Sequence, residues 1–458
     1  MINVKKNNSS IYRICSDLFF ETLMNFYVSV RNKFLISLFF AMCWFVASAW
    51  LSYFWLLDLS KVIGVPLAIF FIFFLALLPG FINAFIACAL LLDRRPQVFF
   101  PKNFPDVDVL IPVYNDGKEV IDTIKSVVAQ DYPGILHVIV INDGSNVHTR
   151  TILNDLSVCY PQIHLINLPR NTGKASALNE GLKIAKSDVI ISIDADCWVK
   201  RDAIKLIVSR YLCDPPNTKA IAGSILVRNS RENWLTKAQE WDYFLGIAAI
   251  KRIQSLFQGT LVAQGAFSLY DRSTLIKLGG WPITVGEDIV LTWRFLAAGY
   301  RIGHAENACV FTNAPNSLKQ FIRQRQRWSR GLIEAFKEEP TLLLKPRLSI
   351  LFIWWNFLFP FIDIAYTLGF IPGLILALFG KFWLVGPMTL ALIPPGLLLN
   401  HVMFRSEKQI FDNSNLGIRK NFFGLFFYMI AYGILLQPAC VWGYFSELFK
   451  LKKVWGTK

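Results

Sequence analysis

Long apolar runs lie on both sides of a more polar centre. Five of them are long enough to cross a bilayer, for which about 20 apolar residues suffice. They are Phe34–Leu57, Val62–Leu92, Leu348–Phe379, Phe382–Phe404 and Phe422–Phe449. The connector Asp58–Lys61 is so short that the first two runs predict a membrane hairpin. Pro360 and Pro438 mark places where later runs can break or re-enter the membrane, so the sequence leaves the number of crossings open.

The central region, from residue 94 to residue 343, alternates short apolar strands with amphipathic helices. The predicted strands are Val107–Pro112, Leu136–Asn142, Ile163–Leu168 and Val189–Ile193, and the helices between them are Val120–Gln130, Val147–Cys159 and Lys174–Lys186. This alternation indicates a parallel sheet covered on both faces, with ligands bound where the strands end. A dehydrogenase-type fold is disfavoured, because Val113–Gly117 stands where that fold has a G-x-G-x-x-G turn.

Composition agrees with a membrane protein. Of 458 residues, 54% are hydrophobic, and the mean hydropathy is +0.42. Lys and Arg number 47 against 32 acidic residues, and their position before the first run and at Arg94-Arg95 predicts a cytoplasmic location for both ends of the hairpin. The charge is spread out and lacks a basic-aromatic motif, so no nucleic-acid partner is expected. Eight scattered cysteines without a C-x-x-C pair predict a reduced, cytoplasm-facing protein without a zinc site.

Two polar motifs follow predicted strands. Asp143, after the second strand, can accept hydrogen bonds from a base or a ribose, although a plain turn would also favour it. Lys174 stands at a helix start, where a lysine suits a phosphate or is simply solvated.

Asp194 and Asp196 follow the fourth strand and are separated by one residue. Two carboxylates at this spacing repel each other unless a cation lies between them. Hard oxygen ligands fit a divalent Mg or Mn ion that bridges to a diphosphate. Helix capping by one Asp is the plain alternative.

A second acidic pair, Glu287 and Asp288, precedes a predicted helix at Ile289–Ala298. A carboxylate here can deprotonate an acceptor hydroxyl, although acidic residues also favour helix N-termini. The segment Gln324–Trp328 (QRQRW) lies on a basic amphipathic stretch, Leu318–Phe336. Its arginines and indole can hold a diphosphate and stack a sugar, or they can lie at a membrane interface.

Together these motifs resemble the processive, inverting GT-A glycosyltransferases of family 2, which include the synthases of cellulose, hyaluronan, chitin oligosaccharides and poly-β-1,6-N-acetylglucosamine. The resemblance covers roughly Val107–Gly331 and rests on four motifs in order, ending in Q-x-x-R-W. The layout of apolar runs is most similar to that of the bacterial poly-β-1,6-N-acetylglucosamine synthases. The fold that this implies is an α/β GT-A, Rossmann-like cytoplasmic domain inserted between transmembrane helices of an integral membrane protein.

The resemblance also implies a role for each motif. Asp288 is the general base, and Asp194 and Asp196 hold the metal. The implied nucleotide-binding residues are Tyr114, Asp116, Asp143, Lys174 and Asp194, and those for the acceptor and the diphosphate are Glu287, Gln324, Arg327 and Trp328. Two residues depart from the family pattern: Asn142 stands where Asp is frequent, and Asp116 stands where Glu is usual.

The implied enzyme uses a UDP-sugar, best matched by UDP-N-acetylglucosamine, to extend and export a β-linked polysaccharide from the bacterial inner membrane. The growing polysaccharide, the lipid bilayer and a small membrane accessory subunit are its implied partners. The predicted parts are a basic cytoplasmic N-terminus (1–33), a membrane hairpin (34–92), the catalytic domain (94–317), an amphipathic interfacial region (318–343), about three transmembrane or re-entrant helices (344–449) and a basic tail (450–458). The segment after residue 404 is predicted to be cytoplasmic from Arg405, Lys408, Arg419 and Lys420.

Two other functions are open. A non-processive transferase that adds one sugar to a lipid carrier shares the sheet and both acidic motifs, and only Gln324–Trp328 argues against it. A transporter with a cytoplasmic regulatory domain predicts no turnover of UDP-sugar. It leaves the acidic motifs unexplained, and the apolar runs hold few charges to mark an ion path, Asp363 being the main exception.

Overall fold

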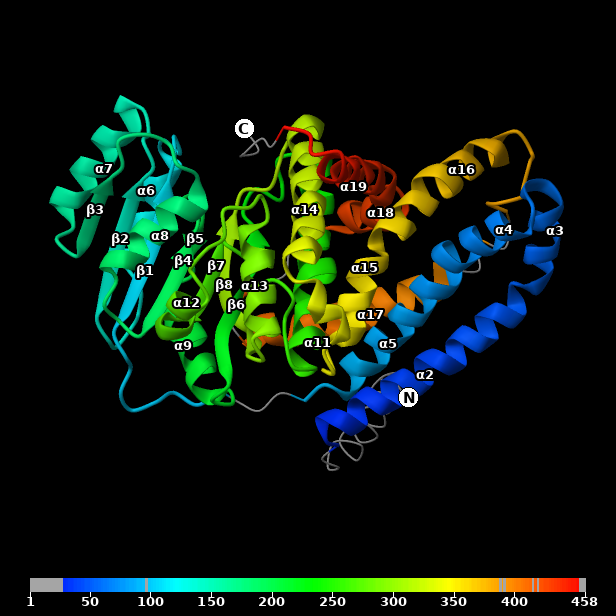
Figure 1. Cartoon of the computed structure of the whole chain (residues 1–458), viewed down its shortest axis with the longest axis horizontal. Helices are drawn as coiled ribbons and strands as arrows, with labels where there is room; N and C mark the ends of the chain where they lie inside the picture. Colours follow the sequence, from blue (N-terminus) through cyan, green and yellow to red (C-terminus); the bar gives the residue numbers. More distant parts are fainter. Residues whose placement is uncertain are drawn as a thin grey trace, which may run out of the picture.

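The computed structural model describes residues 28–94, 98–386, 389, 393–413, 416–417 and 420–452. Most of the basic N-terminus, Arg95, Arg419 and most of the basic tail, for which the sequence predicts cytoplasmic positions, lie outside the described residues. A sheet with its helices forms one side of the molecule, and long helices form the other (Figure 1).

An eight-stranded sheet forms the centre of the first part, with the order β3-β2-β1-β4-β7-β6-β8-β5. The strands are β1 (Val107–Val113), β2 (Leu136–Asn142), β3 (Ile163–Asn167), β4 (Val189–Ile193), β5 (Trp198–Val199), β6 (Thr218–Val227), β7 (Phe267–Asp271) and β8 (Arg301–Thr312). The first four are parallel to one another, as the sequence predicts. The other half, for which the sequence predicts no strands, is mixed: β7 runs antiparallel to β4 and β6, β5 runs antiparallel to β8, and β6 and β8 are parallel.

Apolar side chains point alternately to the two faces of the sheet. In β1, Val109 and Ile111 belong to one hydrophobic cluster, and Leu110 between them belongs to another. The helices that cover the faces are α6 (Glu119–Val128), α7 (Val147–Cys159), α8 (Lys174–Ile184), α9 (Ala203–Cys213), α12 (Arg272–Lys277) and α13 (Glu287–Ala297). Each fully buried aliphatic side chain contributes about 1.5–3 kcal/mol, so both faces stabilise the sheet.

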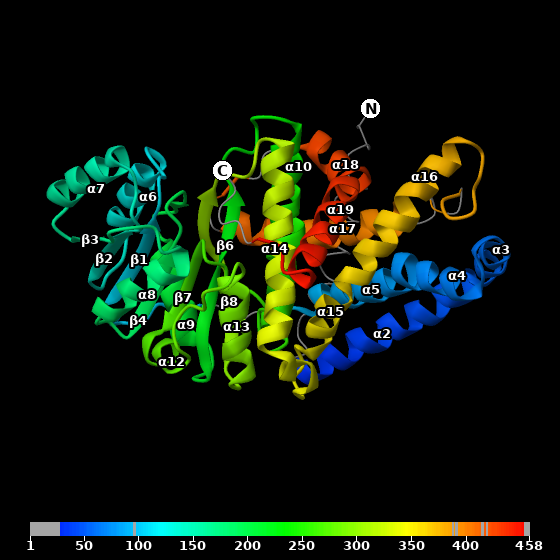
Figure 2. The ribbon, with the colours of Figure 1, turned by 45° about the horizontal axis from the view of Figure 1, so that its top comes forward.

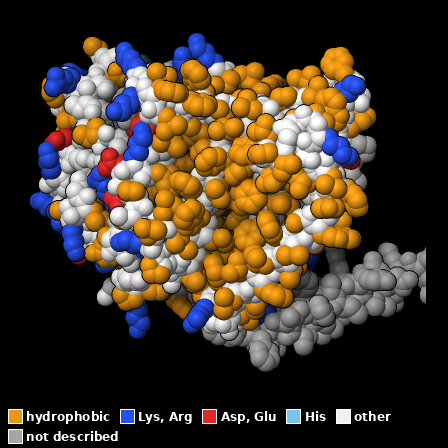
Figure 3. Space-filling model, turned by 45° about the vertical axis from the view of Figure 1, so that its right-hand side comes forward, with side chains coloured by type: hydrophobic (Ala, Val, Ile, Leu, Met, Phe, Trp, Pro, Cys, Tyr) orange, Lys and Arg blue, Asp and Glu red, His pale blue; other side chains and the backbone are white. Residues whose placement is uncertain are grey.

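The helices of the second part include three that are long and apolar enough to cross a membrane: Val30–Leu51, Val65–Leu92 and Ile350–Leu378. The elements before the sheet are α2 (Val30–Leu51), α3 (Tyr53–Ile63), α4 (Val65–Ile72), the π-helical η1 (Phe73–Leu77) and α5 (Leu78–Leu92). Figure 3 shows a broad face of hydrophobic side chains over this helical part, bordered by Lys and Arg. Such a face fits contact with lipid tails.

The predicted connector between the first two apolar runs is wrong. Asp58 and Lys61 lie within α3 and form a salt bridge of 2.9 Å on its surface. The chain turns at Gly64 instead, where φ is +82°, a conformation that glycine adopts without steric cost. Pro66 then stands in the first turn of α4, where a missing N–H group is tolerated.

The helices after the sheet are α15 (Ile350–Ala365), η4 (Tyr366–Phe370), α16 (Ile371–Leu378), α17 (Ile393–Asn413), α18 (Phe422–Ile430) and α19 (Tyr432–Leu448). Pro360 lies inside α15 without ending it, and Pro438 lies inside α19. The pair α18 and α19 is bent by 51°, which is either a broken span or a re-entrant segment. Arg405 and Lys408 lie in α17, so helix replaces the loop predicted at these two positions.

Between the two parts lie α10 (Trp234–Trp241), η2 (Asp242–Ala249), α11 (Ile250–Leu256), α14 (Leu318–Glu338) and η3 (Pro340–Leu344). Figures 1 and 2 show α14 between the sheet and α19. Salt bridges of 2.9 Å join Glu447 of α19 to Arg330 and to Lys337 of α14. On the N-terminal side, Arg252 pairs with Asp93 at 2.6 Å. These buried and half-buried contacts join the central helices to the apolar helices on both sides of the sheet domain in the sequence.

Candidate active site

Three predicted site residues follow the carboxyl ends of neighbouring strands. Tyr114 follows β1, Asp143 follows β2 and Asp194 follows β4, and these strands are adjacent and parallel. The side chain of Tyr114 is exposed, as a residue that stacks on a ligand requires. Its backbone N–H donates to Asp116 Oδ2 at 2.9 Å, so Asp116 closes the turn after β1.

Asp143 is buried and organises the loop before α8. Its carboxylate accepts hydrogen bonds from Thr172 N and Oγ1 at 2.7 and 2.8 Å, from Gly173 N at 2.8 Å and from Asn171 Nδ2 at 3.0 Å. These donors already occupy both carboxylate oxygens. The structure therefore gives Asp143 a positioning role for the loop that carries Lys174, and its predicted contact with a nucleotide stays a prediction.

Lys174 joins the two acidic motifs. Its Nζ atom lies 2.5 Å from Asp194 Oδ1 and 3.2 Å from Glu287 Oε1. Burial by itself lowers the pKa of Lys174, but Asp194 and Glu287 more than offset this and raise the pKa above its ordinary value. The ammonium is therefore charged at neutral pH. Segments more than 90 residues apart in the sequence thus meet through one cation.

Asp196 stands in a cluster of carboxylates. Burial and the nearby charges of Asp194 and Asp116 raise its pKa to about 6, and Glu119 contributes in the same direction. Carboxylates this close repel one another, so they are stabilised when one of them binds a proton or when a cation lies between them. Carboxylate oxygens are the ligands that Mg²⁺ and Mn²⁺ prefer, so Asp194 and Asp196 fit a divalent ion. In the described part of the chain, no group of three or more His, Cys, Asp or Glu side chains could hold a metal alone, so phosphate oxygens would have to complete the shell.

Asp288 begins α13 with its carboxylate held from two sides. Oδ1 accepts from Ile289 N at 2.8 Å, and Oδ2 accepts from Gly265 N at 3.3 Å. Gly265 is a site residue that sequence reasoning missed. A Cβ atom there would lie 2.4 Å from Lys174 Nζ, so any larger residue would force the Lys174 ammonium to move from its position. In the sequence, Gly265 is a single glycine before β7, and no motif around it indicates a site.

A contact between two glycines places Asp288 beside α14. A Cβ atom on Gly331 would lie 2.8 Å from the Cα atom of Gly286, which is closer than real Cβ contacts come. Gly286 N also donates to Glu334 Oε2 at 3.0 Å. The start of α13 therefore packs tightly against α14. This contact sets the position of the Glu287-Asp288 pair relative to the Gln324–Trp328 motif.

Replacing Gly331 with Ala should destabilise this crossing. The added methyl group has to push α13 away, and overpacking of this kind costs about 1–3 kcal/mol. We expect a lower thermal midpoint in detergent and a lower turnover, because Asp288 moves with α13. Gly396→Ala is the matched control, since it is a helical glycine whose Cβ would meet no atom within 4 Å. Equal stability of the two variants would contradict a tight crossing.

The Gln324–Trp328 motif lies on α14, as the sequence predicts, and approaches both acidic motifs. Arg327 lies near enough to Glu287 for its charge to lower the pKa of that carboxyl, against the larger effect of burial, which raises it. The side chain of Trp328 is 38% exposed, and its ring contacts Tyr243 with centroids 6.4 Å apart. Burial raises the pKa of Tyr243 to about 12, with Asp196 among the charges that add to the rise. Trp328 is thus one aromatic ring away from the Asp194–Asp196 region.

Arg325, in the same motif, is an anchor that sequence reasoning did not single out. It is buried and donates to Asp242 Oδ2 at 2.8 Å and to Tyr432 Oη at 2.9 Å. Its guanidinium also lies 4.2 Å from the centroid of Trp328 and covers one face of that ring. The arginines of α14 are therefore not all at a lipid interface, since Arg325 and Arg330 are buried in ion pairs.

Known proteins share sequence similarity with the sheet domain. Residues 108–279 match the model of the family described as Glycosyl transferase family 2. An N-acetylglucosaminyltransferase of Rhizobium meliloti is 31% identical over 252 residues, which cover 52% of this chain and 58% of the relative. A poly-beta-1,6-N-acetyl-D-glucosamine synthase of Staphylococcus aureus is 30% identical over 263 residues, which cover 57% and 63%. The match thus spans about three fifths of the length of these curated relatives.

Among solved structures, a mannosyltransferase of Pyrobaculum calidifontis in complex with GDP-mannose and Mn²⁺ is similar, with a TM-score of 0.59. The similarity covers 84% of this chain and 99% of that chain at 19% sequence identity, so it bears on the fold. The predicted fold class, a GT-A-like α/β domain between N-terminal and C-terminal apolar helices, is confirmed.

Proposed function

We propose that the protein is a membrane-embedded, processive glycosyltransferase, and the match of residues 108–279 to the glycosyl transferase family 2 model supports this. It transfers N-acetylglucosamine from UDP-N-acetylglucosamine to a growing β-linked polysaccharide. One observation carries the proposal: Lys174 bridges Asp194 at 2.5 Å and Glu287 at 3.2 Å, and this brings a diphosphate-binding motif beside the carboxylate of Asp288.

The reaction follows from the positions of these residues. Asp288, half-buried and oriented by two backbone N–H groups, accepts the proton of the acceptor hydroxyl. The acceptor oxygen attacks the anomeric carbon from the side opposite the diphosphate, so one displacement inverts an α-linked donor to a β-linked product. Lys174 and Arg327 hold the departing diphosphate through charge-assisted hydrogen bonds. Tyr114, exposed at the end of β1, stacks on the base.

Asp194 and Asp196 would hold a Mg or Mn ion. Such an ion would neutralise the charge that develops on the leaving diphosphate. The raised pKa of Asp196 supports this assignment, because a cation removes the repulsion that raises it.

The relatives support the choice of donor. Those from Rhizobium meliloti and Staphylococcus aureus are named for N-acetylglucosamine transfer. The test is to incubate membranes that contain the protein with a panel of UDP-sugars and GDP-mannose, and to measure nucleotide release and polymer. We expect release with UDP-N-acetylglucosamine and a polymer that a β-N-acetylglucosaminidase degrades. A single transferred sugar on a lipid would favour the non-processive alternative, and no release with any donor would favour the transporter.

The catalytic domain is proposed to face the cytoplasm of a bacterial inner membrane, where UDP-sugars are made. Single cysteines test this orientation. A cysteine at Val158, which is 82% exposed on α7, should react with an impermeant maleimide only after the cells are permeabilised. A cysteine at Phe379, 78% exposed beyond the end of α16, should react in intact cells. The reverse pattern would exclude cytoplasmic UDP-sugar as the donor.

Trp328 is proposed to hold the sugar at the end of the chain while UDP is exchanged. Arg325 covers one face of the indole, and the ring remains partly exposed for a sugar. A stacking contact of about 1 kcal/mol corresponds to a roughly fivefold change in occupancy. Trp328→Ala should therefore lower polymer yield per inserted molecule about fivefold and shorten the product, whereas Trp328→Phe recovers part of both. UDP binding serves as the control. If polymer yield and length are equal with Trp, Phe and Ala at this position, Trp328 does not hold the end of the chain.

A further inference from the structure

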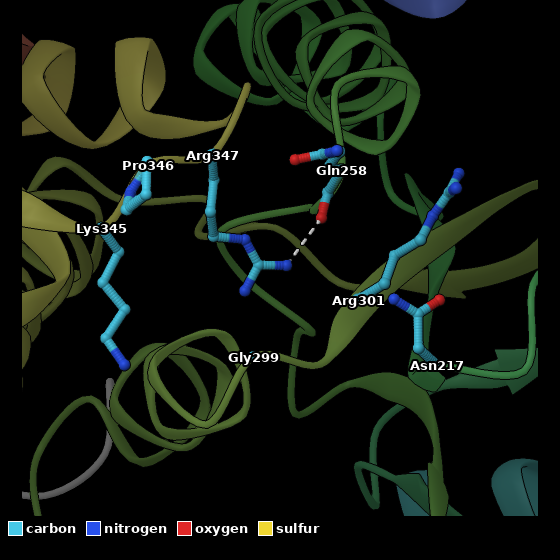
Figure 4. A pocket seen from close by; sticks show the side chains of 7 residues that line it. All are labelled: Asn217, Gln258, Gly299, Arg301, Lys345, Pro346 and Arg347. Carbon is cyan, nitrogen blue, oxygen red and sulfur yellow. Dashed lines mark hydrogen bonds between the residues drawn. The ribbon is translucent and has the colours of Figure 1, made fainter.

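The loop from Gln258 to Ala266 connects α11 to β7 and carries Gly265, whose backbone N–H donates to Asp288 Oδ2. The loop is attached at its beginning, where Arg347 donates to the carbonyl oxygen of Gln258 at 3.3 Å (Figure 4). This attachment lies seven residues before Gly265. The position of Gly265 relative to Asp288 therefore depends on the contacts that residues 262–264 make.

The middle of this loop is bonded to α13. Ala263 N donates to Thr292 Oγ1 at 2.8 Å, and Ala263 O accepts from Tyr270 Oη at 3.2 Å. Thr292 Oγ1 in turn donates to the carbonyl oxygen of Asp288 at 2.6 Å. The loop therefore contacts both the backbone and the carboxylate of Asp288.

Lys251, on α11, also holds this loop. Its Nζ atom donates to the carbonyl oxygen of Val262 at 2.8 Å, and the residue is only 6% exposed. Among the described residues, this is the one hydrogen bond of the ammonium, which forms no salt bridge. An ammonium has three N–H donors, and burying a cation without a paired anion is costly. A methionine of similar shape would avoid this cost, so packing alone does not account for a lysine here.

The charge that Lys251 faces is that of Asp288. Burial lowers the pKa of Lys251 to about 7, and Asp288 is the charged group that opposes this effect. The elements η2, β8 and α5 pack against α11. The titratable residues of η2 and β8 that are not among the groups acting on Lys251 include Asp242, Arg301, His304 and Glu306. The cation beside Asp288 is therefore present below about pH 7 and is lost above it.

Lys174 also carries a positive charge near Asp288, but it is shared. It lies 2.5 Å from Asp194 and 3.2 Å from Glu287, so two other carboxylates take up its charge. Lys251 acts on Asp288 without a competing carboxylate. The titratable groups that interact with the charge of Asp288 are Lys174, Lys251, Tyr270 and Glu287.

We propose that Lys251 is a positioning residue for Asp288: it holds the loop that donates to this carboxylate and supplies the buried positive charge that keeps it ionised. The inference rests on the proposed role of Asp288 as the general base. A carboxylate can take the proton of the acceptor hydroxyl only when it is ionised, and a nearby cation favours that form.

Variants of the full-length protein in detergent test the proposal. Lys251→Met removes both the donor and the charge, Lys251→Arg retains both, and Thr292→Val removes only the hydroxyl contacts of the loop. Lys219→Met is the matched control, because it removes an ammonium that pairs with Asp271 at 3.2 Å beside the start of β4, remote from Asp194. Thermal midpoints establish that each variant is folded. Lys251→Gln, which keeps an N–H donor, takes the place of Lys251→Met if the latter does not fold.

We expect Lys251→Met to lower turnover at pH 7 about tenfold, the effect of losing one hydrogen bond from a charged group, with UDP affinity unchanged. The acid limb of its turnover–pH profile should move up by about one pH unit, because a carboxylate that loses a nearby cation binds a proton more readily. Thr292→Val should lower turnover without moving the acid limb. Lys251→Arg should restore the limb, and Lys219→Met should match the wild type. An acid limb that stays in place in folded Lys251→Met overturns the proposal.

Hydrogen exchange of the peptide that spans residues 258–267 needs no substrate, so it separates this proposal from the proposed function. Its amides should exchange about tenfold faster in Lys251→Met than in the wild type and in Lys219→Met. If the wild type releases no nucleotide from any donor while this exchange is faster, the proposed function is contradicted and the positioning by Lys251 is supported. Unchanged exchange in folded Lys251→Met overturns the proposal, whatever the turnover.

Discussion

Replacing Asp288 with Asn is expected to lower turnover by roughly 10²–10⁴-fold, the usual effect of losing a general base. Binding of UDP should stay unchanged, because the proposed role of this carboxylate is to act on the acceptor hydroxyl. The amide keeps one oxygen to accept from Ile289 N, so α13 keeps its start. Turnover is measured as UDP release in membranes, and UDP affinity by calorimetry on purified protein.

Asp194→Asn is the informative contrast to Asp288→Asn. Asp194 is paired with Lys174 at 2.5 Å, so its loss should weaken nucleotide binding as well as turnover. The two variants therefore separate the acceptor side of the site from the donor side. If Asp288→Asn instead weakens UDP binding and turns over normally at saturation, Asp288 is a nucleotide contact and another group is the base.

Replacing Asp196 with Asn is expected to lower activity by roughly 10³-fold, since neutralisation of a leaving diphosphate supplies several kcal/mol. Chelation with EDTA should abolish turnover of the wild type, and added Mg²⁺ or Mn²⁺ should restore it. Neither ion should rescue Asp196→Asn, which lacks one of the two predicted ligands.

Asp202→Asn is the matched control for Asp196→Asn. It removes a carboxylate six residues further along the chain, where the side chain bonds Lys200 at 2.7 Å and is not among the charges acting on Asp196. We expect it to retain activity. Full turnover of the wild type in excess EDTA would refute the metal assignment.

The first half of the sheet could be predicted from sequence, and the second half could not. The strands β1 to β4 are separated by amphipathic helices, so local periodicity identifies them and their parallel order. The strand β7 follows an irregular segment at Gln258–Ala266, and its pairing with β4 joins residues about 80 positions apart, such as Ile191 and Leu269. Such pairing depends on tertiary contacts that no local pattern contains.

The same distinction applies to the site. The sequence pattern placed Asp194 and Asp196 among the candidate site residues because two carboxylates follow an apolar strand, and Asp288 because an acidic pair precedes a helix. It could not separate Arg325 from Arg327, two arginines of one motif. On a helix they point in directions about 160° apart, so Arg325 is buried against Asp242 while Arg327 lies near Glu287.

The contacts between α14 and α19 also bear on the order in which the parts of the protein assemble during its synthesis. Arg330 pairs with Glu447, a residue that is translated more than 100 positions later, whereas Arg325 already has Asp242 as its charged partner and gains Tyr432 as a second acceptor. A buried cation without its acceptor costs about 3–5 kcal/mol. We therefore expect α14, which carries the Q-x-x-R-W motif, to reach its final position only after α19 has been made. We therefore expect a nascent chain with a finished sheet to lack turnover until the C-terminal apolar helices are assembled around the site.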